Sequence, residues 1–163
     1  MTERSIRLFG DPVLKTPTDD IGVVDERIRS LVQDLLDTVA VPGRAGVAAT
    51  QIGVGLRAFS FNVHGEIGYI LNPRLVEVSG EPTLVEEGCL SVPDLWFPTL
   101  RYSFARVVGV DLEGAPVQLL GTGLMAQALQ HETDHVDGFL YIDKLEKPAH
   151  REAMKQIRES DWF

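Results

Sequence analysis

The chain has 163 residues, of which 44% are hydrophobic and 24% charged, as in ordinary soluble globular proteins. The formal net charge of −9 argues against direct nucleic-acid binding, because phosphate-binding surfaces need clustered Lys and Arg. No apolar run approaches the roughly 18 residues of a membrane span. Glu3, Arg4 and Arg7 lie where a secretory signal would need an apolar core. We therefore expect a cytoplasmic protein that has no membrane partner and folds as a single domain over residues 1–163.

The first predicted element is a helix over residues 25–40, whose apolar residues recur at helical spacing before Pro42 and Gly43. Residues 54–120 instead contain short apolar runs separated by turn residues, which predicts antiparallel hairpins and meanders. The clearest runs are LRAFSFNV at 56–63, IGYILNPRLVEV at 67–78 and RVVGVDL at 106–112.

A second helix is predicted over residues 123–136, with Thr122 as its N-terminal cap and Gly138 as its stop. Its first two turns are nearly free of charge, so we expect this helix to be buried. A short, highly charged helix is predicted over residues 148–160. Helices that flank β-meanders without βαβ alternation indicate an α+β fold: antiparallel sheets around a buried central helix, with N- and C-terminal helices beside them.

The central helix carries His131-Glu132-Thr133-Asp134-His135, an HExxH motif. Residues four apart lie on one helical face, so both imidazoles can reach one metal ion. Glu132 is then close enough to the metal to act as a general base. Burying two imidazoles and a carboxylate together without a metal would be costly.

A catalytic site of this type needs a third protein ligand. Metalloproteases often place a histidine where this chain has Tyr141, which leaves Glu152 in the last helix as a downstream candidate. The upstream candidate is Cys89, whose thiolate suits borderline metals better than a carboxylate and whose neighbour Gly88 permits close backbone approach. We favour Cys89, His131 and His135 around one divalent ion.

Three segments together resemble the peptide deformylase family. They are the stretch from Arg44 to Gln51 (RAGVAATQ), the stretch from Glu87 to Ser91 (EGCLS), and the HETDH motif itself. The likeness covers nearly the whole chain. It implies an α+β peptide deformylase domain over residues 1–163 that removes the formyl group from the N-terminal formyl-methionine of newly synthesised polypeptides.

The resemblance also implies roles for individual residues. Gln51 and the Leu90 backbone N–H would stabilise the oxyanion, while Asp134 would pair with Arg101. The formyl and methionine groups would enter a pocket with a polar edge at Gln127. The expected walls of this pocket are Gly46, Val47, Gly88, Leu124 and Ala128. Trp96 and Phe97 would form either its rim or part of the core, and core packing is the favoured interpretation.

The same resemblance implies that Fe²⁺ is the physiological ion, with Zn²⁺, Ni²⁺ or Co²⁺ as possible substitutes. Some relatives contact the ribosome through a basic C-terminal helix, but this chain alternates basic and acidic residues there, so ribosome binding is only weakly supported. Arg44 replaces the family's usual first glycine. We expect it either to reshape the loop, to contact an acidic substrate, or to remain a tolerated exposed side chain.

Two other functions stay open at this stage. One is an HExxH metallopeptidase with a downstream third ligand. The other is a non-catalytic protein that binds formylated N-termini. His64 and His150, in a predicted turn and at a helix start, are expected to be solvated and to support neither.

Overall fold

The computed structural model describes residues 2–163, which form seven strands in two antiparallel sheets, with three α-helices. This confirms the expected α+β class. The helices are α1 (Glu26–Val39), α2 (Gly123–Val136) and α3 (Lys147–Arg158). The strands are β1 (Gly46–Ala48), β2 (Ala58–Val63), β3 (Glu66–Ser79), β4 (Thr83–Cys89), β5 (Val92–Arg101), β6 (Phe104–Val110) and β7 (Pro116–Thr122).

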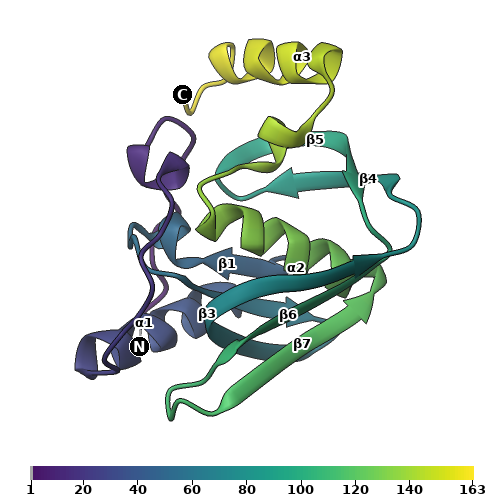
Figure 1. The fold of residues 1–163 in the computed structure, drawn as a ribbon. Coiled ribbons are helices and arrows are strands. Elements are labelled where there is room, and N and C mark those ends of the chain that lie inside the picture. The colour runs from purple at the N-terminus through teal and green to yellow at the C-terminus, as the bar shows by residue number, and fades with distance from the viewer. Residues whose placement is uncertain (1) are drawn as a thin grey trace.

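The larger sheet has the strand order β1-β2-β3-β6-β7, and β4 pairs with β5 in a separate ribbon. Helix α2 lies between the larger sheet and the β4–β5 ribbon, as Figure 1 shows. Helix α1 packs against the β1–β2–β3 end of the sheet, and α3 packs beside β5. Residues on the face of α2 that points away from the larger sheet can therefore contact the ribbon.

Helix α1 follows its predicted bounds to within one residue. The Asp25 side chain accepts hydrogen bonds from the backbone N–H groups of Arg27 and Ile28, which satisfies two donors of the first turn. Its apolar stripe, including the fully buried Leu35, joins a core cluster with β1 and β2. This burial holds the end of α1 beside the short strand β1.

Helix α2 has the predicted bounds, and Gly138 follows it with a left-handed φ of 90°. Two details differ from expectation. Thr122 precedes the helix without a capping side-chain hydrogen bond. The first turn is also open, because Leu124 is 40% exposed, whereas the second half of the helix is largely buried. The charge-free first turn borders a cavity.

The extended N-terminal segment joins two parts of the fold that are distant in sequence. Arg7 N–H donates to the carbonyl of Gln51 at 2.7 Å, and Phe9 N–H donates to the carbonyl of Ser91 at 2.8 Å. Gln51 belongs to the 3-10 turn η2 (Ala49–Ile52), and Ser91 lies between β4 and β5. This segment therefore fixes the turn after β1 relative to the ribbon.

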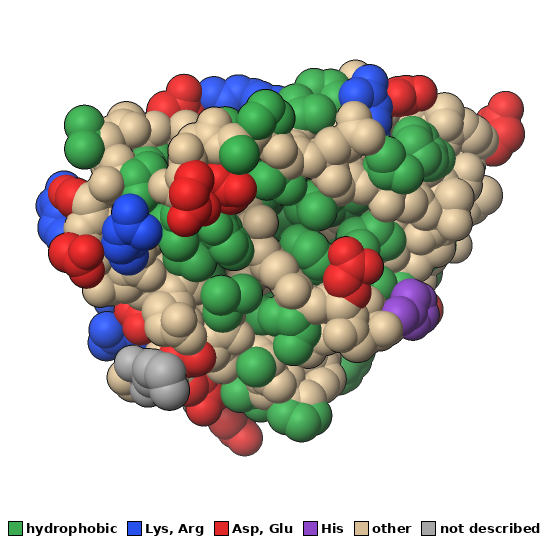
Figure 2. Space-filling model, turned by 90° about the horizontal axis from the view of Figure 1, so that it is seen from below, with side chains coloured by type: hydrophobic (Ala, Val, Ile, Leu, Met, Phe, Trp, Pro, Cys, Tyr) green, Lys and Arg blue, Asp and Glu red, His purple; other side chains and the backbone are tan. Residues whose placement is uncertain are grey.

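Within residues 2–163, no helix has both the length and the apolar character needed to cross a bilayer. Among the described residues on the face shown in Figure 2, Lys and Arg side chains are scattered and form no continuous basic patch. His64 is exposed in the turn between β2 and β3, as expected. His150 is only partly exposed, because its Nδ1 lies 2.9 Å from the Ile142 carbonyl.

Candidate metal centre and active site

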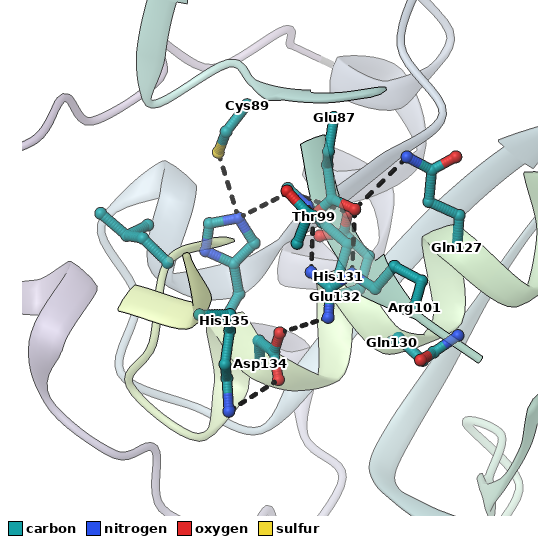
Figure 3. Close-up of polar contacts among 12 residues, drawn as sticks. Glu87, Cys89, Thr99, Arg101, Gln127, Gln130, His131, Glu132, Asp134 and His135 are labelled. Carbon is teal, nitrogen blue, oxygen red and sulfur yellow. Dashed lines mark hydrogen bonds and ion pairs between the residues drawn. The ribbon is translucent and has the colours of Figure 1, made fainter. Parts of the chain in front are cut away.

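Three side chains converge between α2 and the ribbon. His131 and His135 lie one turn apart on α2, and Cys89 ends β4 (Figure 3). The His135 Nε2 atom is 3.3 Å from Cys89 Sγ and 3.2 Å from His131 Nε2. All three potential ligand atoms lie within 4.8 Å of one another. The structure thus brings together the three residues for which the sequence predicts a common metal ion.

The chemistry of these donors fits a cation. His131 Nδ1 is 2.7 Å from Glu87 Oε2, so it must carry a proton, which leaves its Nε2 to present a lone pair when the ring is neutral. The lone pairs of two imidazole nitrogens and a thiolate sulfur that face one point repel one another, and a cation between them removes this repulsion. Cys and His side chains are also common ligands of borderline divalent metals. The residues therefore fit a bound metal ion.

Without a metal, only protonation can relieve this contact. Burial by itself lowers the pKa of both imidazoles. The nearby Glu132 carboxylate reverses the effect for His131 and raises its pKa well above the ordinary value, while burial and the charge of His131 hold the pKa of His135 well below it. One shared proton can satisfy the two nitrogens, whereas a divalent ion can satisfy the sulfur as well.

Glu87 orients the first histidine and was not predicted from the sequence. Its carboxylate also accepts two hydrogen bonds from Arg101, at 2.9 Å from Nε and 2.5 Å from Nη2. Burial would raise the pKa of Glu87, but the hydrogen bonds from Arg101 and His131 outweigh it and lower this pKa to about 2. One signal could have found this residue. Glu87 and Cys89 are two apart in a strand and so lie on the same face.

The expected contact between Arg101 and Asp134 is present. Arg101 Nη1 lies 2.8 Å from Asp134 Oδ2, and the arginine side chain is 6% exposed. Arg101 on β5 therefore joins Glu87 on β4 to Asp134 on α2. Figure 3 shows this group beside the three candidate metal ligands.

Glu132 is the second buried carboxylate of the site. It is 3% exposed, and its Oε1 atom has no hydrogen-bond partner among the described residues. Burial raises its pKa to about 7, against the lowering effect of the His131 charge. Gly46 packs directly against it, because a Cβ added to Gly46 would lie 2.5 Å from Glu132 Oε2. A carboxylate in this state can exchange a proton near neutral pH.

Gln51 and Leu90 both lie beside the candidate metal ligands. The Gln51 side chain is buried, with Oε1 accepting the Ala48 N–H at 3.0 Å and Nε2 3.2 Å from Ser91 Oγ. The same Nε2 is 3.8 Å from Cys89 Sγ, so the amide points toward the candidate ligands. Leu90 follows Cys89 directly and lines the cavity with Gln51. Ser91, which the sequence analysis did not single out, supports the amide.

A cavity of about 480 Å³ opens beside these groups. Four of the five predicted pocket walls line it, namely Gly46, Gly88, Leu124 and Ala128, and so does Gln127. Val47 does not line the cavity, which corrects the prediction, because its side chain is fully buried in the core beside α1.

The two aromatic residues of β5 have different environments. Trp96 lines the cavity and is 63% exposed, so it forms part of the rim and not the core, contrary to the favoured interpretation. Phe97, in contrast, is buried in the core cluster with α3. Successive strand residues point to opposite faces, which explains the difference.

The residues proposed for a downstream metal ligand do not supply one. The Glu152 carboxylate accepts a hydrogen bond from Gln156 within the exposed surface of α3. Tyr141 stacks on His131, with ring centroids 6.2 Å apart, and its hydroxyl donates to the Leu95 carbonyl. The metallopeptidase alternative therefore loses its third ligand.

The sequence and the fold match those of known proteins over nearly their full lengths. A sequence model described as polypeptide deformylase matches residues 3–151. The chain is 47% identical to a peptide deformylase of Parafrankia sp. over 163 residues, covering 99% of this chain and 89% of the relative. It is 41% identical to peptide deformylase 1 of Corynebacterium efficiens over 167 residues, covering 100% and 99%.

Solved structures agree. A crystal structure of a peptide deformylase from Legionella pneumophila matches with a TM-score of 0.89 at 34% identity, over 97% of this chain and 95% of that one. The peptide deformylase from Ehrlichia chaffeensis, solved in complex with actinonin, matches with a TM-score of 0.88 at 30% identity over 99% of both chains. The chain therefore belongs to the peptide deformylase family, the metal-dependent hydrolases that remove the N-formyl group from newly made peptides.

Proposed function

We propose that Cys89, His131 and His135 bind a single ferrous ion, and that the residues around it hydrolyse the formyl group of formyl-methionyl peptides. The observation that carries this proposal is the convergence of one sulfur and two imidazole nitrogens within 4.8 Å, beside a buried carboxylate and an open cavity. A divalent ion bound there would supply positive charge that makes water more acidic and polarises the formyl carbonyl. The choice of iron rests on family resemblance, and zinc, nickel or cobalt could bind the same donors.

Glu132 would be the general base. Its unpartnered Oε1 can accept a proton from the attacking water, and burial raises its pKa, which favours the protonated form that later gives the proton up. As the water oxygen bonds to the formyl carbon, the carbonyl π electrons move onto the formyl oxygen; the carbon–nitrogen bond breaks afterwards, when that oxygen re-forms its double bond to carbon. Glu132 then passes its proton to the departing amine, which yields formate and a free methionine N-terminus.

Gln51 and Leu90 would stabilise the negative charge that develops on the formyl oxygen. The Gln51 amide is held by Ala48 and Ser91, so its Nε2 can donate without reorganising. The backbone N–H of Leu90 would provide the second donor. Removal of one such donor typically raises the barrier by about 3 kcal/mol.

The cavity would select the substrate by size. Gly46 and Gly88 line the cavity, and each packs too closely against a neighbouring side chain to accept a Cβ, which at Gly88 would lie 2.6 Å from Trp96 Nε1. A formyl group, which carries only hydrogen beyond its carbonyl, would fit where an acetyl group would not. Leu124 and Ala128 would contact the methionine side chain, with Gln127 at the polar edge.

We expect nascent formyl-methionyl polypeptides in the cytoplasm to be the substrates, and residues 1–163 to act as one catalytic domain. Helix α3 offers weak support for ribosome docking, because its four basic residues are accompanied by Glu152 within the helix and by Glu146 and Glu159 at its ends. The net charge of −9 gives no support to direct nucleic-acid binding.

The decisive assay is formate release from formyl-Met-Ala-Ser by protein loaded anaerobically with ferrous ion. We expect turnover by the wild type, and for Glu132→Ala a loss of about 10²–10⁴-fold with the metal retained. Tight peptide binding without formate would instead support a non-catalytic formyl-peptide binding protein. Retention of metal by Cys89→Ser, together with internal cleavage of unformylated peptides, would support a metallopeptidase.

A further inference from the structure

Arg44 occupies the loop between α1 and β1, at the position where the family usually has a glycine. Its Nη1 atom donates to the Thr38 carbonyl at 2.8 Å, and its Nη2 atom is 3.3 Å from Glu3 Oε1. The side chain is only 17% exposed. The guanidinium is therefore directed to the end of α1 and the N-terminal segment, which leaves it engaged within the protein and not free to meet an acidic substrate.

The Thr38 carbonyl lacks its usual helical partner. An α-helix would satisfy it with the N–H of residue 42, but residue 42 is Pro and has no N–H. The last turn of α1 also contains no basic residue. Arg44 supplies both the missing donor and a positive charge at the negative end of the helix dipole.

The loop that Arg44 anchors is one edge of the substrate cavity. Gly43, Arg44, Ala45 and Gly46 all line the cavity. Gly43 has a φ of 90°, and because a glycine has no Cβ it restricts the loop backbone less than any other residue would. With glycine at position 44 as well, this edge would contain two consecutive residues without a side chain.

The chain beyond Arg44 is held independently. The Ala45 carbonyl accepts the Asn62 N–H at 2.8 Å, and Gly46 pairs with Phe61 in the β1–β2 ladder. The contact between Gly46 and Glu132 therefore does not depend on the arginine. Loss of the anchor should loosen residues 43 and 44 while the general base keeps its place.

We infer that Arg44 is a positioning residue, which fixes the cavity rim by tying the loop to the C-terminal end of α1. It therefore strengthens substrate binding and leaves the chemical step nearly unchanged. This inference rests on the proposed function of the cavity. It predicts that Arg44→Ala and Arg44→Gly raise the KM for formyl-Met-Ala-Ser by about five- to tenfold, with kcat within about twofold of wild type. Arg44→Lys, which keeps the charge and a donor, should raise the KM less than either of these substitutions.

Arg4→Ala is the matched control. Arg4 also forms an ion pair with α1, at 2.9 Å from Asp34 Oδ2, but the pair lies outside the loop and the cavity lining. We expect its KM to stay within about 1.5-fold of wild type. Hydrogen exchange provides a second measurement that needs no bound metal. The Ala40 amide, which donates to the Leu36 carbonyl where α1 ends and the loop begins, should exchange at least about fivefold faster in Arg44→Ala than in Arg4→Ala.

Two results would overturn the inference. One is an active wild-type enzyme whose KM and Ala40 amide exchange are unchanged by Arg44→Ala. The other is an equal rise in KM for Arg44→Ala and Arg4→Ala, which would indicate a general loss of stability. An inactive wild type that binds metal would instead contradict the proposed function, so the two failures can be told apart.

Discussion

At the scale of single residues, the absence of a side chain matters as much as its presence. Gly46 packs against Glu132, so any atom added to Gly46 would have to displace the Glu132 carboxylate. Glu132 is buried with one unpartnered oxygen, so small displacements change which groups it can reach. Proton transfer depends steeply on such geometry.

We predict that Gly46→Ala lowers kcat by at least about tenfold, because the new methyl group must displace the Glu132 carboxylate. The φ angle of Gly46 is not left-handed, so the backbone itself tolerates alanine. Steady-state deformylation of formyl-Met-Ala-Ser measures the effect. Gly55→Ala is the matched control, because nothing lies within 4 Å of its added Cβ. Equal activity of the two variants would contradict the proposed place of Glu132.

Residue-level prediction succeeded where spacing alone determines geometry. The i, i+4 histidines of HETDH had to share a face once α2 formed, whereas Val47 lies in a three-residue strand too short for any period to reveal its inner face. Trp96 and Phe97 are adjacent, so one had to point outward, but only the packing of α3 determines which. The orientation of Arg44 depends on Pro42 and the end of α1, contacts that no local pattern specifies.

At the scale of elements, the site is assembled from α2 and the β4–β5 ribbon. The joint between them is the buried group of Arg101, Glu87 and Asp134, which links two strands to the helix that carries both histidines. The order of the helices and the presence of hairpins could be predicted from apolar periodicity. The separation of β4 and β5 into their own sheet could not, because strand partners depend on the whole fold.

We predict that Arg101→Ala destabilises the protein by about 3–5 kcal/mol at pH 7, because it leaves buried carboxylates without their partner. Urea denaturation measures this change. Metal affinity should fall about 10–100-fold, since Glu87 would no longer hold His131 in place. Unchanged stability and metal affinity would contradict the role of this group.

The ion pair between Glu87 and Arg101 makes the free energy of unfolding depend on pH. The pKa of Glu87 is lowered from 4.5 to about 2 in the folded protein. Its contribution is therefore fully present above pH 4.5 and is lost as the pH falls toward 2. Arg101→Ala should lose less stability than wild type over this interval, as denaturation at a series of pH values would test.

At the scale of the whole molecule, a metal bound at the proposed site would couple folding to catalysis. The two histidines and the cysteine come from elements that meet only in the folded chain, so an ion bound by all three favours the native state. Ligand present at 100 times its dissociation constant stabilises the fold by about 2.7 kcal/mol.

We predict that chelation lowers the melting temperature of the wild type, and that it lowers the melting temperature of Cys89→Ser much less.

With ferrous ion bound, activity should decay faster in air than under anaerobic conditions as iron or Cys89 oxidises, whereas nickel-loaded protein should lose less activity in air. Activity half-lives measured under both atmospheres test this. Equal half-lives for the ferrous enzyme would count against iron as the physiological metal.

The two backbone hydrogen bonds of the N-terminal segment have a practical consequence. Through them, Arg7 and Phe9 hold Gln51, one proposed oxyanion donor, at a fixed distance from Ser91, the neighbour of the other proposed donor, Leu90. Trimming the first nine residues would let those donors drift apart while the helix with both histidines stayed intact. Phe163, although 61% exposed, packs against Phe9 with ring centroids 5.9 Å apart, so a tag at either end of the chain should be joined through a flexible linker that leaves this contact intact.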